Sequence, residues 1–210
     1  MEYILGIHLN VPRSTAKRIV AARNRSNALR RPDQDFEPHV TLYLCRLSRP
    51  AFRQLLADIR TRRLPSVVLH LDRVRARTAE RDFRFVVLQV RRTKSLVRLH
   101  QAVAAAGNRL RAGQLRKKDI LRIRIGEYST FERTTTVRFG YRWAGPGFSP
   151  HVTVSRSPVR PSAARHLAQQ LRDIVGTSWR AKSLVVGLYR YNNASRRYVG
   201  RAVERTVRLR

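Results

Sequence analysis

The sequence predicts an α+β protein built from two similar halves. Apolar residues recur at helical spacing in some segments and alternate with polar residues in others, which predicts both helices and strands. The segment Phe36–Leu42 (FEPHVTL) returns almost unchanged as Phe148–Val154 (FSPHVTV). Around these copies the order helix, histidine strand, helix, strand, strand occurs twice. We therefore expect one domain over residues 1–210, in which an internal duplication relates residues 1–92 to residues 93–210.

The first half is predicted to begin with a strand and to contain two helices. Ser14 is placed to cap the first helix, and Pro65 ends the second. The second helix has Phe52, Leu55 and Ile59 at helical spacing. The predicted elements are a strand at 3–10, a helix from 14 to about 29, the first histidine strand from 39, a helix at about 49–63, and strands near 67–74 and 83–90.

The second half follows the same plan with one long addition. The predicted elements are a helix at 96–110, the second histidine strand from 151, a helix from 162 to about 175, and strands near 183–191 and 198–209. The addition, residues 111–147, is basic. Within it Leu121–Ile125 alternates apolar residues with arginines, which predicts a hairpin with Thr134–Phe139. Two interpretations of this insertion stay open: it contacts substrate, or it is a structural flap or oligomer contact.

The charge of the chain points to a polyanionic partner. Lys and Arg number 45 and Asp and Glu 13, which gives a net charge of +32. Such a field attracts nucleic acid. Most of the basic residues are arginines, which add bidentate phosphate contacts and stacking on bases. Arginine-rich codon usage is an alternative source of the arginines, but it does not explain the shortage of acidic residues.

Other features of the sequence limit the classes of function. A single cysteine, Cys45, excludes an internal disulfide and a multi-cysteine metal site. The apolar segment Tyr3–Pro12 is too short to span a membrane and lacks a basic leader. No metal-ligand spacing, Walker-type loop or nucleophile elbow is found, which disfavours metal hydrolases and NTPases. We expect a soluble, cytoplasmic monomer that needs no cofactor, binds RNA or an oligonucleotide and does not bind membranes.

The repeated motif has a geometry suited to acid-base chemistry. Residues two apart on a strand point to the same face, so each copy presents a histidine and a threonine on one side and apolar residues on the other. The prolines Pro38 and Pro150 favour extended backbone before each strand. If the two strands face each other across a groove, two imidazoles and two hydroxyls converge on one point. Such an arrangement suits a reaction at phosphate.

The paired motifs resemble the signature of the two-histidine (2H) phosphoesterase superfamily. That family includes 2'-5' RNA ligase-like enzymes and RNA 2',3'-cyclic phosphodiesterases. The resemblance implies two pseudo-symmetric lobes, each with a β-sheet flanked by helices, around a central groove lined by the two histidine strands. It also implies metal-independent phosphodiesterase activity on RNA 2',3'-cyclic phosphate ends or 2'-5' linked oligonucleotides, with 2'-5' ligation as the reverse reaction.

Position by position, the resemblance assigns roles to residues of this chain. The catalytic histidines are His39 and His151, and the hydroxyls that donate to phosphate oxygens are Thr41 and Thr153. Arg156 occupies a place where family members often carry an arginine that clamps the phosphate. Four aromatic residues are candidates to stack on a base: Phe36, Tyr43, Tyr128 and Phe148. Core packing is the alternative interpretation of the two phenylalanines.

One histidine would act as general base and the other as general acid, because an imidazole titrates near neutral pH. The symmetry of the repeat does not assign the two roles. Two other functions stay open: a non-catalytic basic RNA-binding protein on the same fold, and a phosphodiesterase for small cyclic nucleotides. Outside the motifs we interpret the remaining histidines, His8, His70, His100 and His166, as surface or packing residues.

Overall fold

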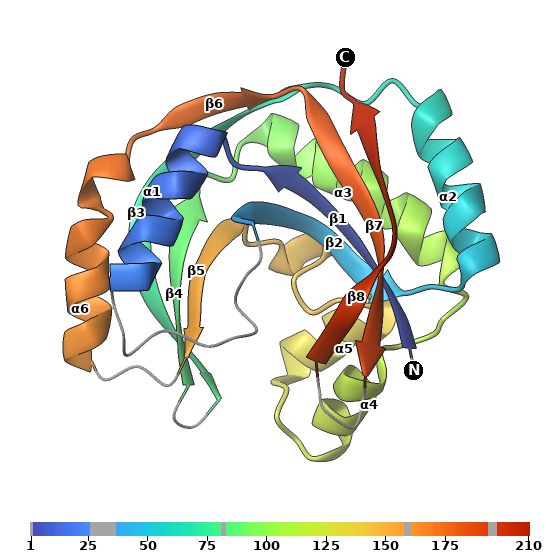
Figure 1. Cartoon of the computed structure of the whole chain (residues 1–210). Helices are drawn as coiled ribbons and strands as arrows, with labels where there is room; N and C mark the ends of the chain where they lie inside the picture. The colour runs from blue at the N-terminus through green and yellow to red at the C-terminus, as the bar shows by residue number, and fades with distance from the viewer. Residues whose placement is uncertain (1, 26–36, 81–82, 158–160, 193–196) are drawn as a thin grey trace.

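In the computed structural model of the protein (Figure 1), residues 2–25, 37–80, 83–157, 161–192 and 197–210 are described. The α-helices are α1 (Arg13–Arg25), α2 (Arg49–Thr61), α3 (Lys94–Leu110), α4 (Lys117–Arg124), α5 (Thr130–Phe139) and α6 (Pro161–Gln170). The 3-10 turns are η3 (Gly145–Gly147) and η4 (Arg172–Ile174). The strands are β1 (Glu2–Asn10), β2 (His39–Arg46), β3 (Val67–Glu80), β4 (Phe83–Val90), β5 (His151–Ser157), β6 (Ser178–Ala181), β7 (Ser183–Asn192) and β8 (Arg197–Arg208). The predicted α+β class is therefore confirmed.

The strands form one antiparallel sheet with the two histidine strands at its centre. Its order is β6-β3-β4-β5-β2-β1-β7-β8. Strands from the two halves of the sequence are interleaved, because β4 of the first half lies beside β5 of the second, and β1 of the first half lies beside β7 of the second. That the chain consists of two repeats, which meet near residue 92, stays a prediction. In space, each histidine strand adjoins strands from the other half of the chain.

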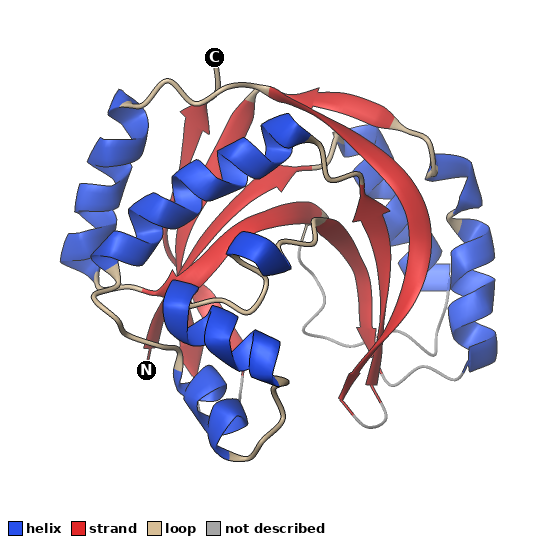
Figure 2. Ribbon diagram, turned by 180° about the vertical axis from the view of Figure 1, so that it is seen from behind, coloured by secondary structure: helices blue, strands red, loops and turns tan. Residues whose placement is uncertain are grey.

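Helices α1, α2, α3 and α6 cover the outer side of the curved sheet, whereas α4 and α5 lie below it (Figures 1 and 2). Helices α1 and α6 lie against the half that contains β5, and α3 lies against β2 and β3, with α2 packed on α3 and β7. On this side Leu5, Leu9, Val40 and Val152 are fully buried. Burying one such side chain stabilises the fold by about 1.5–3 kcal/mol, so the apolar face of each motif strand is fixed toward the helices. The opposite face of the alternating strands is left for polar residues.

The predicted hairpin in the insertion is wrong, because this segment forms the helices α4 and α5. Its local signals were helical: Ser129 and Glu132 form a capping box, and Gly140 ends α5 in the left-handed conformation. The alternation that suggested a strand does not mark a buried face, since Leu121 and Ile125 are 41% and 56% exposed.

The remaining differences concern the boundaries of elements. The first helix ends at Arg25, and the rest of its predicted extent, up to residue 29, lies outside the described residues. The helix predicted from 162 to 175 divides into α6 and the turn η4. Strand β6 was not predicted. Within the described part of the chain, no helix is both long enough and apolar enough to cross a bilayer.

Candidate functional site

The two histidine strands lie side by side. Strands β2 and β5 pair antiparallel with Val40 opposite Val152. In this register His39 faces Thr153 across the strand pair, and Thr41 faces His151. Side chains of directly opposed residues start about 4.5–5.5 Å apart at their Cβ atoms. The structure therefore brings both predicted histidine–threonine pairs together on one face of the sheet, while the intervening valines are buried on the other.

Each motif strand contains a bulge directly after its threonine. In the pairing of β1 with β2, His8 is opposite Thr41 and Ile7 is opposite Tyr43, so Leu42 has no partner residue. The pairing of β4 with β5 skips Val154 in the same way. A bulge re-aims side chains and increases the local twist of a strand. Its occurrence at the same place in both copies gives the two half-sites the same backbone geometry.

Both catalytic candidates are held through the same ring nitrogen. The Nδ1 atom of His39 lies 2.8 Å from the carbonyl oxygen of Glu37, and that of His151 lies 2.7 Å from the carbonyl oxygen of Ser149. A carbonyl oxygen only accepts hydrogen bonds, so each Nδ1 donates. The neutral form of each ring therefore has its lone pair on Nε2. This bond fixes both the tautomer and the orientation that proton transfer requires.

A third histidine lies beside His39. His8 is on β1 opposite Thr41, and the centroids of the His8 and His39 rings are 4.5 Å apart. Burial, with smaller contributions from His39 and Arg201, lowers the pKa of His8 to about 3. Burial also lowers the pKa of His39, against the opposing effects of the Glu37 carbonyl and the Glu204 carboxylate. Both rings are therefore neutral at neutral pH.

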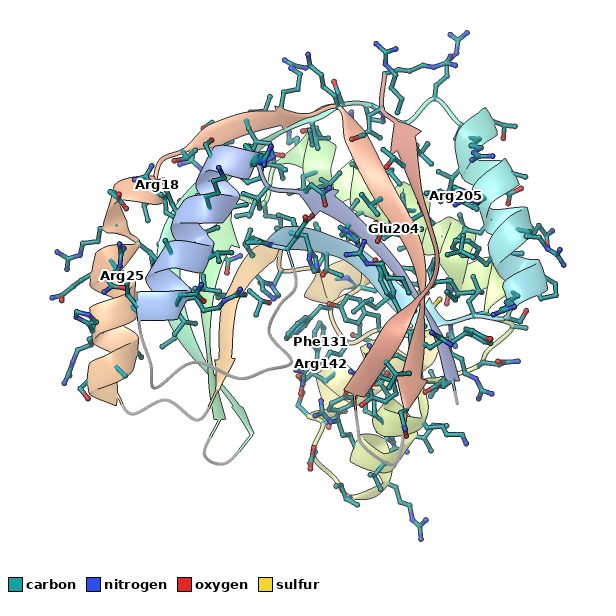
Figure 3. The ribbon with its side chains drawn as sticks, in the orientation of Figure 1. Arg18, Arg25, Phe131, Arg142, Glu204 and Arg205 are labelled. Carbon is teal, nitrogen blue, oxygen red and sulfur yellow. The ribbon has the colours of Figure 1, made fainter. Side chains whose placement is uncertain are left out.

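A polar cluster on β7 and β8 continues from this half-site. The Tyr189 hydroxyl donates to Glu204 Oε2 at 3.0 Å, and Arg201 donates to Glu204 Oε1 at 3.1 Å. Figure 3 labels Glu204 on β8. The Tyr189 ring lies over the paired glycines Gly6 and Gly187, where a Cβ on Gly6 would approach the ring to 2.9 Å. Two glycines in register thus make room for a tyrosine that orients the carboxylate near His39.

The insertion supplies the surroundings of His151. The Trp143 ring is perpendicular to the His151 ring, at 86°, with centroids 4.9 Å apart. The Arg142 guanidinium lies 4.5 Å from the Trp143 centroid and 5.4 Å from that of Tyr128, and it donates to Glu132 Oε1 at 3.4 Å. Arg142, labelled in Figure 3, follows the end of α5. The insertion therefore reaches one of the two catalytic candidates, and Trp143 is half-buried at that place.

His100 connects the two motifs from the interior. Its Nδ1 donates to the Leu42 carbonyl at 2.8 Å, and its Nε2 accepts from the Gly145 amide at 2.9 Å. The ring stacks on Phe148, with centroids 3.8 Å apart. Burial lowers its pKa to about 4, so the ring is neutral and both nitrogens are satisfied. The interpretation of His100 as a packing residue is confirmed.

The structure corrects the predicted base-stacking residues. Tyr43 is fully buried and donates to the Phe139 carbonyl at 2.5 Å. Phe148 is 3% exposed against His100, and Tyr128 is 8% exposed and donates to Asp119 at 2.7 Å. These three side chains are packed in the interior, so their rings are not accessible for stacking on a base. Phe36 lies outside the described residues.

Arg156 lies on β5, opposite Phe85 of β4. Its role at the phosphate stays a prediction.

Sequence reasoning missed His8 and Trp143, which the structure places beside the two catalytic candidates. Periodicity put His8 on the face of β1 opposite Leu5 and Leu9. No local signal showed that β1 adjoins β2. Within the described residues, no cluster of three or more His, Cys, Asp or Glu side chains could hold a metal ion.

Comparisons with known proteins agree with this arrangement. No curated protein sequence matches the chain significantly. A structure titled as a phosphoesterase superposes with a TM-score of 0.59 at 16% identity, covering 99% of both chains. Escherichia coli LigT complexed with 3'-AMP gives 0.58 at 14% identity, again covering 99% of both chains. TT0787 of Thermus thermophilus gives 0.57 at 14% identity over 98% of each.

These similarities establish the fold. A model of one protein family, described as the 2'-5' RNA ligase superfamily, matches residues 11–193 and so includes both histidine motifs. With the paired motifs on adjacent strands and the family match over most of its length, the chain belongs to the 2'-5' RNA ligase superfamily of 2H phosphoesterases.

Proposed function

We propose that this protein is a metal-independent phosphodiesterase that acts on RNA 2',3'-cyclic phosphate ends or on 2'-5' linked oligonucleotides. The observation that carries the proposal is the register of β2 and β5, which places two histidine–threonine pairs on one face of the sheet. Each imidazole is oriented through Nδ1 and so presents Nε2 for proton transfer. Two oriented imidazoles and two hydroxyls provide both proton transfers and hydrogen bonds to the phosphate oxygens.

The surroundings break the symmetry between the two histidines. His39 lies against the neutral ring of His8, and its own pKa is lowered by burial, so it is suited to accept a proton. His151 is also buried, at 9% exposed, so it is the neighbouring ring, His8 or Trp143, that differs between the two half-sites. His39 is therefore assigned as the general base and His151 as the general acid. Bound phosphate, a nearby anion, favours the protonated form that the acid requires.

The reaction at a cyclic end then follows from these roles. His39 Nε2 removes a proton from water, whose oxygen forms a bond to phosphorus. The bond from phosphorus to the 3' oxygen breaks, and His151 Nε2 donates a proton to that oxygen, which leaves a 2'-phosphate. Thr41 and Thr153 donate to the non-bridging oxygens, and Arg156 is assigned the role of binding the negatively charged phosphate. Each proton transfer accounts for about 10² to 10⁴ in rate.

Ligation is the same sequence with a 5'-hydroxyl in the place of water: the 5' oxygen bonds to phosphorus while the 3' oxygen leaves and takes the proton, which forms a 2'-5' linkage. Hydrolysis dominates in dilute solution because water is in large excess. The nucleotide named with the LigT structure, 3'-AMP, supports a nucleotide-containing ligand for this chain as well. The net charge of +32 favours a longer polyanion over a small cyclic nucleotide.

The decisive experiment is an assay of RNA ending in a 2',3'-cyclic phosphate, in the presence of EDTA. We expect turnover by the wild type and its loss in His39→Ala and His151→Ala, while both variants still bind the RNA. A wild type that binds RNA but turns over no cyclic phosphate or 2'-5' linkage would support the alternative, a basic RNA-binding protein on this fold. The large excess of basic residues is the observation that favours this second function.

A further inference from the structure

A basic pocket lies at the end of the molecule where the chain terminates, away from the histidine motifs. It forms where α2 ends, where β3 begins, where β6 passes into β7, and where β8 ends. Figure 1 shows these segments together beside the C-terminus. Its volume is about 690 Å³. Six cationic side chains line this distal basic pocket: Arg60, Arg62, Arg180, Lys182, Arg208 and Arg210.

No side-chain carboxylate lies in the lining of this pocket. Asp and Glu are absent from the lining of the pocket, and among the described residues none of the six cations forms an ion pair. Other arginines of the chain behave differently, since Arg18 pairs with Asp173 and Arg109 pairs with Asp58. Like charges gathered at one place repel each other and raise the local potential. An anion bound there removes this repulsion.

Backbone hydrogen bonds hold the pocket in shape without a ligand. The Ser66 amide donates to the Arg210 carbonyl at 2.7 Å, and the Arg210 amide donates to the Leu64 carbonyl at 2.9 Å. The Leu209 amide donates to the Lys182 carbonyl at 2.8 Å. Because these bonds join segments far apart in the sequence, the cations are presented by a fixed frame. Binding therefore requires ordering of the side chains but not of the backbone.

Strand β8 connects this pocket to the histidine site. The end of β8 contributes residues of both its faces to the pocket, and two of them, Thr206 and Arg208, lie on the same face as Glu204, because residues two apart share a face. Glu204 raises the pKa of His39 and so lies within its electrostatic reach. From Glu204 to Arg208 the strand spans about 13 Å. A few nucleotides of single-stranded RNA cover a path of this length.

We propose that the distal basic pocket binds backbone phosphates of single-stranded RNA whose 3' end lies at the histidine motifs. The proposal rests on the proposed function for the identity of the polyanion. The polar groups that line the pocket besides the cations are hydroxyls, of Ser66 and Thr206, and the lining contains no aromatic ring. Such a lining recognises phosphate and not bases, so the contact is independent of sequence. It favours long RNA over a dinucleotide.

The test compares two triple variants that remove equal charge. Arg60→Gln/Arg180→Gln/Arg208→Gln changes the pocket. The control, Arg53→Gln/Arg98→Gln/Arg165→Gln, changes exposed arginines on α2, α3 and α6. The ligands are a labelled 12-nucleotide RNA ending in a 2'-phosphate, which is not a hydrolysis substrate, and the matching dinucleotide. Fluorescence anisotropy over a salt series gives each affinity, and thermal unfolding checks that both variants are folded.

We expect the pocket variant to lose affinity for the 12-mer, with the slope of log K against log salt reduced by about 2, while its affinity for the dinucleotide is unchanged. Equal losses in the two variants, or no loss in the pocket variant, would overturn the proposal. So would a pocket variant that loses binding of free tripolyphosphate but keeps that of the 12-mer. Because the binding ligands do not react, this result is independent of turnover. Failure of the proposed phosphodiesterase would appear separately, as absent hydrolysis.

Discussion

The two half-sites have the same backbone and different neighbours. Each presents a histidine held through Nδ1, a threonine, and a bulge one residue later. At the position opposite the threonine, however, the first half-site has His8 and the second has Val87. The ring beside His151 is instead Trp143, which comes from the insertion. The two half-sites therefore share the groups to which the proposed mechanism assigns the proton transfers, and they differ in the groups around them.

The two half-sites also differ in their electrostatic surroundings. Near His39 burial lowers the pKa of the ring and so disfavours a positive charge, although the Glu37 carbonyl and Glu204 partly oppose it. Near His151 an aromatic ring, itself covered by the Arg142 guanidinium, forms one wall of the site. In the proposed mechanism, two identical side chains perform opposite proton transfers at the same pH because their surroundings differ.

The largest expected effect tests the assignment of base and acid. His39→Ala and His151→Ala should each lower kcat by about 10² to 10⁴ on RNA cyclic phosphate. An aryl phosphodiester has a leaving group that needs no protonation, so on this substrate His151→Ala should recover most of its activity and His39→Ala should not. Steady-state kinetics on both substrates measure the effect. The reverse pattern of recovery would exchange the two roles.

The second prediction concerns the link between the half-sites. His100→Ala removes the partners of the Leu42 carbonyl and the Gly145 amide, and each buried group left unsatisfied costs about 1–3 kcal/mol. We expect the free energy of unfolding to fall by roughly 2–6 kcal/mol in denaturant titrations. His100→Gln, which can still donate and accept, is the matched control and should lose less. Equal losses would mean that packing on Phe148, not the two hydrogen bonds, is what matters.

The sequence predicted the parts of this site that depend on local pattern. The repeat identified both histidine–threonine pairs, and alternation assigned them a common face, because a strand's period of two is a local property. The partners His8 and Trp143 depend on which strands adjoin and on how the insertion folds, and neither is visible in a single segment. The insertion itself was wrongly predicted as a hairpin although Ser129, Glu132 and Gly140 gave capping signals.

The aromatic candidates Tyr43 and Phe148 lie in the interior, and for Phe148 this agrees with the alternative interpretation as core packing. Tyr43 follows the bulge at Leu42, and Phe148 precedes the second motif strand, so proximity to the motif in sequence suggested proximity to a ligand. Both rings instead make contacts in the interior. The Tyr43 hydroxyl donates to the Phe139 carbonyl, and the Phe148 ring stacks on His100. Residues near a catalytic histidine in sequence alternate between the two faces of the sheet, and only the tertiary arrangement shows which face binds.

The third prediction tests the wall beside His151. Trp143→Ala should raise KM for RNA substrates by about tenfold, since a base stacked on an aromatic ring contributes about 1–3 kcal/mol. Trp143→Phe keeps a ring at the same place and should recover most of the affinity. Comparing KM and kcat separates the possibilities: if kcat falls and KM does not change, Trp143 orients the imidazole instead of holding the base.

The smallest expected effect isolates the influence of His8 on the base. A general base is active when neutral, so activity is lost as the pH falls through the pKa of His39, which burial places below the usual 6.5. His8→Asp puts a carboxylate beside the ring and favours its charged form, which should move the acidic limb of the kcat/KM profile upward by about one pH unit. His8→Asn is nearly the same size and neutral, and should leave this limb close to that of the wild type. If instead the basic limb moved in His8→Asp, the histidine beside His8 would be acting as the acid, and the difference between the half-sites would have the opposite chemical meaning.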